Sequence, residues 1–184
     1  MASASPRRKE LLGEVIEKFE IVPAQGEEYA EEGLPPNRLV CALAEQKASE
    51  VASLPLAKGK AVLGADTVVA LEGEVLGKPK DEADAARMLK MLSGRAHEVY
   101  TGVCVIFPDG TKRVEADCTK VYFLPLDEAK ISAYIATGSP MDKAGAYGIQ
   151  DGGLVERIEG SFSNVVGLPV ELCKRLTEGC VCGK

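Results

Sequence analysis

The length, composition and charge of the chain exclude several classes of protein. Its 184 residues suit one domain, and 46% hydrophobic with 27% charged residues exclude a disordered, collagen-like or coiled-coil chain. The formal net charge of −6 has the wrong sign for non-specific binding to nucleic acid, so we expect no nucleic-acid partner. A small anionic ligand stays possible, because a pocket needs only a few convergent cations.

The apolar pattern and the cysteines indicate where the protein resides. The first residues lack the apolar core of a signal peptide, and no window approaches the roughly 20 apolar residues that span a bilayer. We therefore expect a cytoplasmic protein with no membrane partner and with reduced, mostly buried cysteines. Cys180 and Cys182 lie in a glycine-flanked tail that suggests a frayed terminus, with metal binding as the alternative. His97, the only histidine, is the one candidate for a histidine-based site.

Apolar periodicity, caps and turn residues predict helices mixed with strands. In chain order the predicted elements are a helix from Pro6 to about Phe19, a helix over about 37–52, a strand over 61–71 turning into 75–76, a helix from Asp81 to 93–94, hairpin strands over 98–107 and 112–123, a helix from Asp127 to Gly138, a shaped loop over 139–153, a strand over 154–158 and a helix from about Leu168. This pattern indicates an α/β fold with a mixed twisted sheet, flanking helices and a long hairpin. We expect one domain over residues 1–184, in which two lobes could enclose a cleft.

A basic segment opens the first predicted helix. Cations occupy positions 7–9, beside a helix N-terminus that already carries partial positive charge. The arrangement repels itself, and it becomes favourable if an anion binds, because backbone N–H groups, the Ser3 and Ser5 hydroxyls and the guanidinium groups all converge on a phosphate. The alternative is a solvated basic turn offset by nearby glutamates.

A single carboxylate, Asp66, interrupts the apolar run over residues 62–69. Burial of an unpaired carboxylate is costly, so this side chain requires a compensating partner. One interpretation is a core carboxylate paired with a lysine or with backbone donors. The other places Asp66 on the floor of a cleft, as a metal ligand or as the base for a water molecule, where Gly64 and Ala65 would let a ligand approach closely.

Two isolated lysines and an acidic stretch point in the same direction. Lys47 interrupts the apolar row of its helix, and Lys78 lies between a glycine and a proline that fix a tight connection. Either lysine could simply extend its ammonium group to water. Residues 27–32 are typical of a solvated face, yet one of their carboxylates could help to hold a divalent cation. Phosphate donors, isolated lysines and carboxylates together suggest phosphoryl chemistry with a metal.

Segments spread in order along the chain resemble signatures of the Maf family. They are Ser3-Ala-Ser-Pro-Arg-Arg-Lys-Glu-Leu-Leu, Gly64-Ala-Asp-Thr, Leu76-Gly-Lys-Pro, Leu92-Ser-Gly-Arg-Ala-His, Asp142-Lys-Ala-Gly-Ala-Tyr-Gly-Ile-Gln and Asn164-Val-Val-Gly-Leu-Pro. The resemblance runs from Ala2 to about Leu172 and implies a fold similar to that of inosine triphosphatase.

Maf proteins are cytoplasmic nucleoside triphosphate pyrophosphatases that serve nucleotide-pool house-cleaning. The resemblance therefore implies hydrolysis of a nucleoside triphosphate to the monophosphate and pyrophosphate, by attack of water on the α-phosphorus. It implies a divalent metal, magnesium first and manganese as the alternative, and we also expect a homodimer. By resemblance, Asp66 is the proton acceptor or a metal ligand, and Glu28 is a supporting carboxylate at the metal. The residues implied around the phosphates are Ser3, Arg8, Lys47, Lys78 and Lys143.

The same resemblance implies a base preference. Arg7, Thr67 and Gln150 stand at positions that look like specificity markers, and this trio resembles the branch that acts on dTTP and UTP. An amide such as that of Gln150 offers both a donor and an acceptor to the imide edge of uracil or thymine.

Two positions depart from the pattern of the family. Family members have a short apolar strand before the basic segment, whereas here only Met1 and Ala2 precede it, so the first strand is expected to be missing or reduced. Asp151 stands where a glycine is common after the glutamine, so the base loop is expected to adopt a different conformation.

Two other functions stay open at this point. The chain could be a nucleotide-sensing regulator of septum formation, since Maf proteins have been linked with cell division. It could also be a pyrophosphatase for modified pyrimidine nucleotides, which would share the chemistry and differ only at the base pocket. An ionised carboxylate beside isolated lysines argues against a sensor, because binding alone does not require it.

Overall fold

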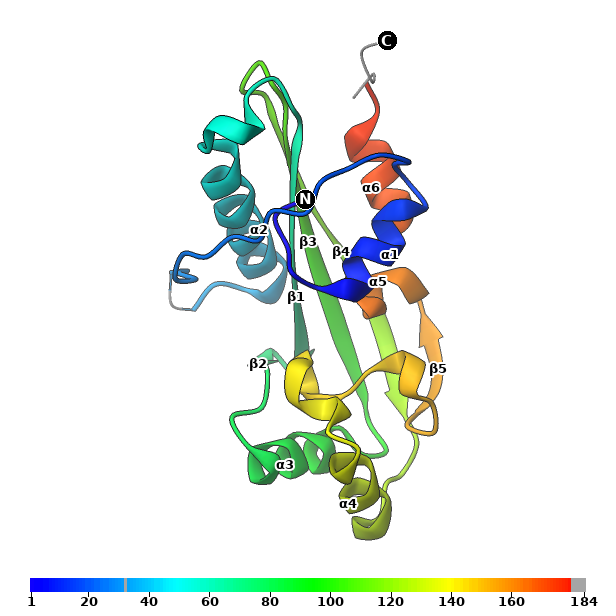
Figure 1. Cartoon of the computed structure of the whole chain (residues 1–184). Helices are drawn as coiled ribbons and strands as arrows, with labels where there is room; N and C mark the ends of the chain where they lie inside the picture. Colours follow the sequence, from blue (N-terminus) through cyan, green and yellow to red (C-terminus); the bar gives the residue numbers. More distant parts are fainter. Residues whose placement is uncertain (32, 180–184) are drawn as a thin grey trace.

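A five-stranded sheet in the order β2-β1-β3-β4-β5 forms the centre of the protein (Figure 1). The structure, a computed structural model, describes residues 1–31 and 33–179. The strands are β1 (Val62–Leu71), β2 (Glu74–Leu76), β3 (Ala96–Ile106), β4 (Lys112–Phe123) and β5 (Val155–Glu159). Every pairing in this sheet is antiparallel. The expected α/β fold with flanking helices and a long hairpin is confirmed, but the expectation of a mixed sheet is wrong.

The sheet is antiparallel because its helical connection does not cross a face. Parallel neighbours require a crossover that runs back along the sheet. Here the chain leaves β1, makes the short hairpin strand β2, and forms a helix at the same end of the sheet before it enters β3 (Figure 1). Strand β3 therefore runs opposite to β1, with Asp66 opposite Gly102 in the register.

Helices flank the sheet on both faces and at one end. They are α1 (Pro6–Gly13), α2 (Pro36–Ala52), α3 (Glu82–Leu92), α4 (Glu128–Ala136), α5 (Phe162–Val166) and α6 (Val170–Thr177). Single 3₁₀ turns occupy Pro55–Ala57, Ser139–Asp142, Ala144–Ala146 and Ile149–Asp151. The predicted caps are present: Asp81 and Asp127 each accept a backbone N–H from the first turn of their helix, at 2.8 Å.

One helix is shorter than predicted and one short helix was not predicted. The first helix ends at Gly13, and Phe19 packs on the same apolar cluster as Leu12 from irregular chain beyond the helix. Apolar spacing indicates which side chains are buried, but it does not show that the backbone between them is helical throughout. The short helix α5 was not predicted, because its five residues are too few for a periodic signal.

Glycines let α2 approach the sheet to backbone distance. A Cβ atom built on Gly64 would lie 2.3 Å from the carbonyl oxygen of Ala44, and one built on Gly102 would lie 2.3 Å from that of Val40. Real Cβ atoms do not come this close to a backbone oxygen, so both positions require glycine while α2 keeps its place. The close contact sets the height of the whole helix above β1 and β3.

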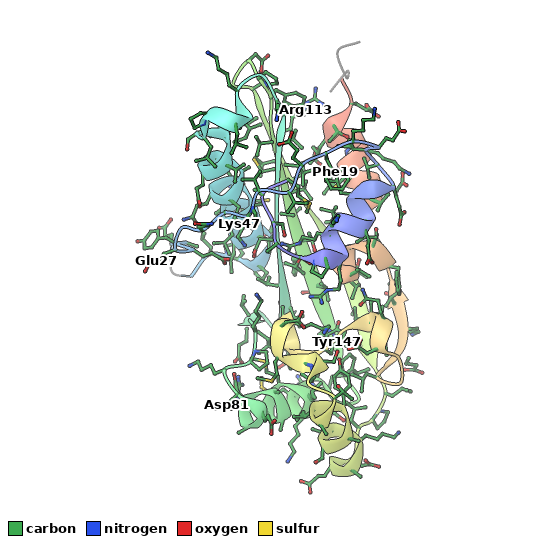
Figure 2. All side chains as sticks on the ribbon, in the orientation of Figure 1. Phe19, Glu27, Lys47, Asp81, Arg113 and Tyr147 are labelled. Carbon is green, nitrogen blue, oxygen red and sulfur yellow. The ribbon has the colours of Figure 1, made fainter. Side chains whose placement is uncertain are left out.

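Apolar side chains form clusters at the two ends of the sheet. Near one end, α1 and α6 pack on one face, where Phe19 lies, while α2 packs on the opposite face (Figure 2). Near the other end, α3, α4 and the loop that carries Tyr147 form a further cluster. The single-domain organisation expected from the sequence stays a prediction. No helix in the described ranges is long and apolar enough to cross a membrane.

The only histidine belongs to the core. His97 is 2% exposed, and its Nε2 lies 2.8 Å from the hydroxyl oxygen of Tyr147. Burial lowers the pKa of His97 to about 4, so the ring is neutral at physiological pH. A neutral ring stacked edge-on against Phe123 and Tyr147 has a packing role.

The described cysteines agree only in part with the expectation of burial. Cys104 and Cys173 are buried, and burial raises the pKa of both thiols. Cys118 is exposed on β4. Cys180 and Cys182 lie outside the described residues.

The helix contact is testable with a matched pair of glycine variants. Gly102→Ala should lower the free energy of unfolding by about 3 kcal/mol, because its methyl group must displace the backbone of α2. Gly13→Ala, at a helix end where an added Cβ would meet no atom within 4 Å, should change it by less than about 1 kcal/mol. Urea unfolding of both variants gives the comparison, and equal midpoints would contradict the proposed packing constraint.

Candidate functional site

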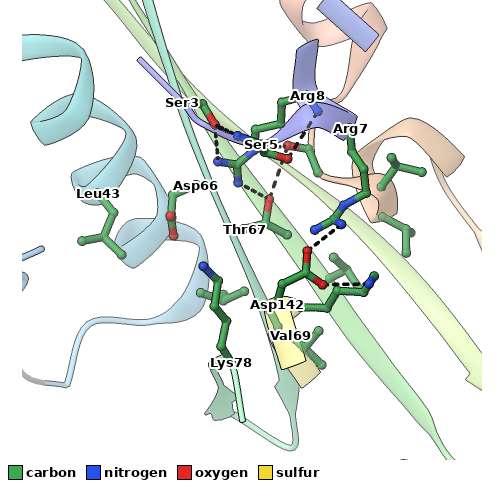
Figure 3. Close-up of a pocket in the computed structure, with 18 of the residues that line it drawn as sticks. Ser3, Ser5, Arg7, Arg8, Leu43, Asp66, Thr67, Val69, Lys78 and Asp142 are labelled. Carbon is green, nitrogen blue, oxygen red and sulfur yellow. Dashed lines mark hydrogen bonds and ion pairs between the residues drawn. The ribbon is translucent and has the colours of Figure 1, made fainter. Parts of the chain in front are cut away.

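A cavity of about 780 Å³ opens between the two ends of the sheet, beside β1 (Figure 3). The N-terminal segment, α2, β1, the connection after β2, the loop after α4 and the loop after α5 all contribute to its wall. The structure brings every site residue predicted from the sequence to this wall. These residues are Ser3, Arg7, Arg8, Glu28, Lys47, Asp66, Thr67, Lys78, Lys143 and Gln150.

The cavity lies at the edge of β1, where regular strand pairing is interrupted. Strand β2 pairs only with residues 69–71 of β1. Nearer the start of β1, the backbone N–H of Ala2 donates to the carbonyl oxygen of Leu63 at 2.8 Å, and the N–H of Val22 donates to that of Met1 at 3.0 Å. Met1 and Ala2 therefore extend the hydrogen bonding of the β1 edge beyond the strands of the described sheet, and the expectation of a reduced first strand stays a prediction.

Asp66 lies on the α2 side of this edge and is paired with Lys47. The ammonium nitrogen of Lys47 is 2.5 Å from Asp66 Oδ1 and 2.9 Å from Glu28 Oε1. The Lys47 and Asp66 side chains are only 15% and 12% exposed, so each charge compensates the other where water is scarce. The pair satisfies the core interpretation of Asp66, and its place on the cavity wall also satisfies the cleft interpretation.

Glu28 reaches this pair because α2 holds the loop that carries it. The side-chain amide of Gln46 donates to the carbonyl oxygen of Glu27 at 2.8 Å and accepts from the N–H of Tyr29 at 3.1 Å. One turn further on, the Glu50 carboxylate accepts the N–H groups of residues 25 and 26. The sequence reasoning missed Gln46, which carries no charge and interrupts no pattern.

The Arg8 guanidinium donates most of its hydrogen bonds to the surrounding protein. Its Nε donates to the carbonyl oxygen of Gly167 and its Nη1 to that of Ala65, both at 2.8 Å. The same guanidinium donates to the hydroxyl oxygens of Ser3 at 3.4 Å and Thr67 at 3.0 Å (Figure 3). A guanidinium has five N–H donors, so these bonds leave one for an anion. Burial lowers the pKa of Arg8, yet the group stays protonated.

Arg7 points into the cavity and meets the opposite wall. Its Nη1 is 3.0 Å from Asp142 Oδ2, and the ammonium of Lys143 is 2.8 Å from Asp142 Oδ1 (Figure 3). Burial raises the pKa of Asp142, but the hydrogen bonds from Lys143 and Arg7 outweigh it and hold the pKa below its usual value. Asp142 is thus an ionised carboxylate between two cations. Arg7 lies 135 residues away in the sequence, so no local pattern could have indicated that the two side chains pair.

Asp66 and Thr67 reach the cavity from opposite faces of the sheet. Successive side chains of a strand alternate in direction, so Asp66 faces α2 while Thr67 faces α1. The Thr67 hydroxyl lies 3.0 Å from that of Thr101 and accepts from Arg8. The cavity therefore wraps around the edge of β1, with Lys78 pointing toward Asp66 from below (Figure 3).

Part of the cavity wall is apolar and belongs to one core cluster. Val69, Val99, Tyr147 and Val165 line it, and Gln150 supplies an amide from the 3₁₀ turn Ile149–Asp151. An apolar lining with a few polar groups is typical of sites for small organic ligands, and we call this part of the wall the apolar slot.

Residues 1–180 match the family described as Maf-like protein. The chain belongs to the Maf family. Maf relatives include a protein named dTTP/UTP pyrophosphatase from Thermococcus gammatolerans, 50% identical over 97% of this chain and 94% of the relative. Proteins with the same name from Bdellovibrio bacteriovorus and Carboxydothermus hydrogenoformans are 48% and 50% identical, over 96% and 92% of this chain and 95% and 91% of their own.

A solved structure also aligns with this Maf chain. It is a nucleoside-triphosphatase, also named dITP/XTP pyrophosphatase, from Mycobacterium abscessus. The alignment covers 68% of this chain and 73% of that one, with 19% identity and a TM-score of 0.43.

The two neighbouring arginines should differ in their effect on stability. Arg8→Ala should lower the free energy of unfolding by about 2–4 kcal/mol, because it removes charge-assisted donors from buried carbonyl oxygens. Arg7→Ala, whose side chain is 27% exposed and makes one ion pair, should change it by less than about 1 kcal/mol. Urea unfolding without nucleotide measures both, and an Arg8→Ala protein as stable as Arg7→Ala would refute the assignment of Arg8 to the scaffold.

Proposed function

We propose that this chain hydrolyses nucleoside triphosphates, dTTP and UTP in preference, to the monophosphate and pyrophosphate. The observation that carries the proposal is one cavity that holds an ionisable carboxylate, Asp66, together with cations on several walls. Those cations are Arg7, Lys47, Lys78 and Lys143. The shared name of the Maf relatives supports the same reaction and the same substrates.

In the proposed mechanism, the cations hold the triphosphate and Asp66 acts on water. Asp66 accepts a proton from a water molecule whose oxygen attacks the α-phosphorus. A new P–O bond forms, the bond from the α-phosphorus to the bridging oxygen breaks, and pyrophosphate leaves with its charge balanced by Lys47 and Lys78. Arg7 and Lys143 bind the phosphates from the other side of the cavity, and Ser3 and Arg8 each supply a hydrogen-bond donor.

Asp66 and Glu28 are the residues proposed to hold a divalent metal. Both carboxylates already contact one cation, the Lys47 ammonium, so their oxygen atoms converge on a positive charge. No group of three or more His, Cys, Asp or Glu side chains suited to a metal occurs in the part of the chain that the structure describes. One or two carboxylates completed by substrate phosphates suit magnesium, with manganese as the alternative. Such an ion would neutralise phosphate charge.

The base preference is proposed to depend on Gln150 and on the size of the slot. An amide can accept the N3–H and donate to a carbonyl oxygen of uracil or thymine, while cytosine presents the reverse pattern. Thr67 lines the same cavity with its hydroxyl already bonded to Arg8 and Thr101, so it is proposed to restrict the base chiefly by its shape.

Two alternatives keep the same cavity. A pyrophosphatase for modified pyrimidine nucleotides would use the same carboxylate and cations. A nucleotide-sensing regulator of septum formation would bind the triphosphate without hydrolysis. The Lys47–Asp66 pair favours an enzyme, because a sensor for a polyanion gains nothing from an ionised carboxylate in its site.

Removal of the Asp66 charge should abolish turnover without unfolding the protein. Asp66→Asn is nearly isosteric and should lower kcat by about 10²–10⁴-fold, because the amide cannot accept the proton of water. Asp117→Asn, on β4 away from the cavity, is the matched control and should retain wild-type kcat. Pyrophosphate release measured beside a thermal melt checks both variants. Wild-type turnover by Asp66→Asn would refute the assigned role.

Nucleotide choice gives a second test. With magnesium present, dTTP and UTP should show at least about tenfold higher kcat/KM than CTP, ATP or GTP, because one mismatched hydrogen-bond pair is worth that much. Steady-state pyrophosphate release over the five nucleotides, with and without magnesium, provides the measurement. An equal value for CTP and dTTP would overturn the base assignment and leave the hydrolytic one in place.

The expected homodimer and the cytoplasmic location stay predictions. Light scattering of the purified chain would measure the oligomeric state directly.

A further inference from the structure

The Asp151 carboxylate joins three segments at the rim of the cavity. It ends the 3₁₀ turn Ile149–Asp151, directly after Gln150. Its Oδ2 lies 2.5 Å from the hydroxyl oxygen of Tyr134 in α4 and 2.6 Å from that of Ser139 in the following turn. None of these three residues lines the cavity itself.

The charge of Asp151 determines the direction of the bonds around it. A carboxylate has no proton to donate, so both hydroxyl groups must donate to it. The oxygen of Tyr134 is then free to accept the backbone N–H of Gly148 at 3.0 Å, and that of Ser139 accepts from the Lys143 ammonium at 3.0 Å. Asp151 thereby orders two further bonds whose donors, on Gly148 and Lys143, do belong to the cavity wall.

The packing at this rim leaves little freedom. A Cβ atom built on Gly148 would lie 2.8 Å from Lys143 Cε and 3.0 Å from Asp151 Oδ2. Gln150 lies between two residues, 148 and 151, that are both bonded to the Tyr134 hydroxyl. The backbone that presents its amide to the slot is therefore held on either side.

The pKa shifts of Asp151 and Tyr134 agree with these hydrogen-bond directions. Burial raises the pKa of Asp151, but the hydrogen bonds from Ser139 and Tyr134 outweigh it and leave the pKa below its usual value. Burial and the bond to Asp151 raise the pKa of Tyr134, so its proton stays on the phenol oxygen. The carboxylate is the acceptor and the phenol the donor throughout the neutral range.

We propose that Asp151 is a positioning residue that holds Gln150 and Lys143 in place for the base and the phosphates of the nucleotide. A glycine at this position would leave the Tyr134 and Ser139 hydroxyls without their shared acceptor. The proposal rests on the proposed function of the cavity, and it assigns to Asp151 an effect on nucleotide affinity and base discrimination, with the chemical step unaffected.

The test compares Asp151→Gly and Asp151→Asn with the control Asp109→Asn in the β3–β4 turn. Asp151→Gly should raise the KM for dTTP by about tenfold and lower the dTTP-to-CTP ratio of kcat/KM by a similar factor, since one ordered hydrogen-bond network is lost. Its kcat and melting temperature should stay near wild type. Asp151→Asn keeps an acceptor oxygen, so its KM for dTTP and its dTTP-to-CTP ratio should lie between those of Asp151→Gly and wild type. Asp109→Asn should match wild type in both.

A second variant separates a positioning role of Asp151 from a general disturbance of the folded structure. Tyr134→Phe removes one of the two hydroxyl donors and should also raise the KM for dTTP. In the double variant with Asp151→Gly the two effects should be less than additive, because both remove the same connection. Independent, additive effects would overturn the proposal, as would a KM and a dTTP-to-CTP ratio within twofold of wild type for Asp151→Gly. A fall in kcat with unchanged KM would overturn it as well.

Equilibrium binding distinguishes a failure of the positioning role of Asp151 from a failure of the proposed hydrolytic function. Titration calorimetry of dTTP and CTP in the presence of a metal chelator measures affinity without turnover. If the wild-type chain binds dTTP and releases no pyrophosphate with magnesium, the hydrolytic function is refuted and the Asp151 variants still test positioning through Kd. If Asp151→Gly and wild type bind both nucleotides equally, the role of Asp151 is refuted whatever the enzyme does.

Discussion

The close contact between α2 and the sheet is the constraint on which the site depends. Gly64 on β1 and Gly102 on β3 allow the helix backbone to rest directly on the strands. At that height Lys47, in the C-terminal half of α2, meets Asp66, which lies opposite Gly102 in the sheet. A larger residue at either glycine would move the helix away and leave a mostly buried carboxylate without its counter-charge. The packing of α2 on the sheet therefore determines whether Lys47 and Asp66 can pair in the cavity.

In the proposed function, the edge of β1 lets one strand serve two halves of a nucleotide. The Asp66 side chain reaches the face covered by α2, where the metal and phosphate chemistry is proposed. The Thr67 side chain reaches the opposite face, and both side chains line the same cavity. Arg8 ties this edge together, since it bonds β1 and the loop after α5 through the carbonyl oxygens of Ala65 and Gly167. The strand alternation that separates the two side chains also separates the two tasks.

Local charge in the cavity differs from the charge of the chain as a whole. The net charge is −6, yet the cavity carries lysines and arginines on several walls. Carboxylates already accompany them, as Asp142 does between Arg7 and Lys143. In the proposed function, a triphosphate that enters this cavity would exchange partners with those carboxylates, so its binding would depend on competition between anions as well as on attraction. The same Lys143 also donates to the Ser139 hydroxyl, which in turn donates to Asp151.

The sequence by itself determined most of the element types and the caps, because these depend on local chemistry, and it named the residues that the structure gathers in one cavity. A proline after a capping serine predicted the start of the first helix, and a carboxylate within a valine-rich run, together with motifs resembling the Maf family, singled out Asp66 and the other cavity residues. Only the tertiary structure decided the antiparallel order of the sheet, the commitment of Arg8 to the scaffold, and the contacts of Gln46, Asp142 and Asp151. Each of these depends on which distant backbone or side chain fills a given space, and hydrophobic periodicity specifies the face that is buried but not the atom that it meets.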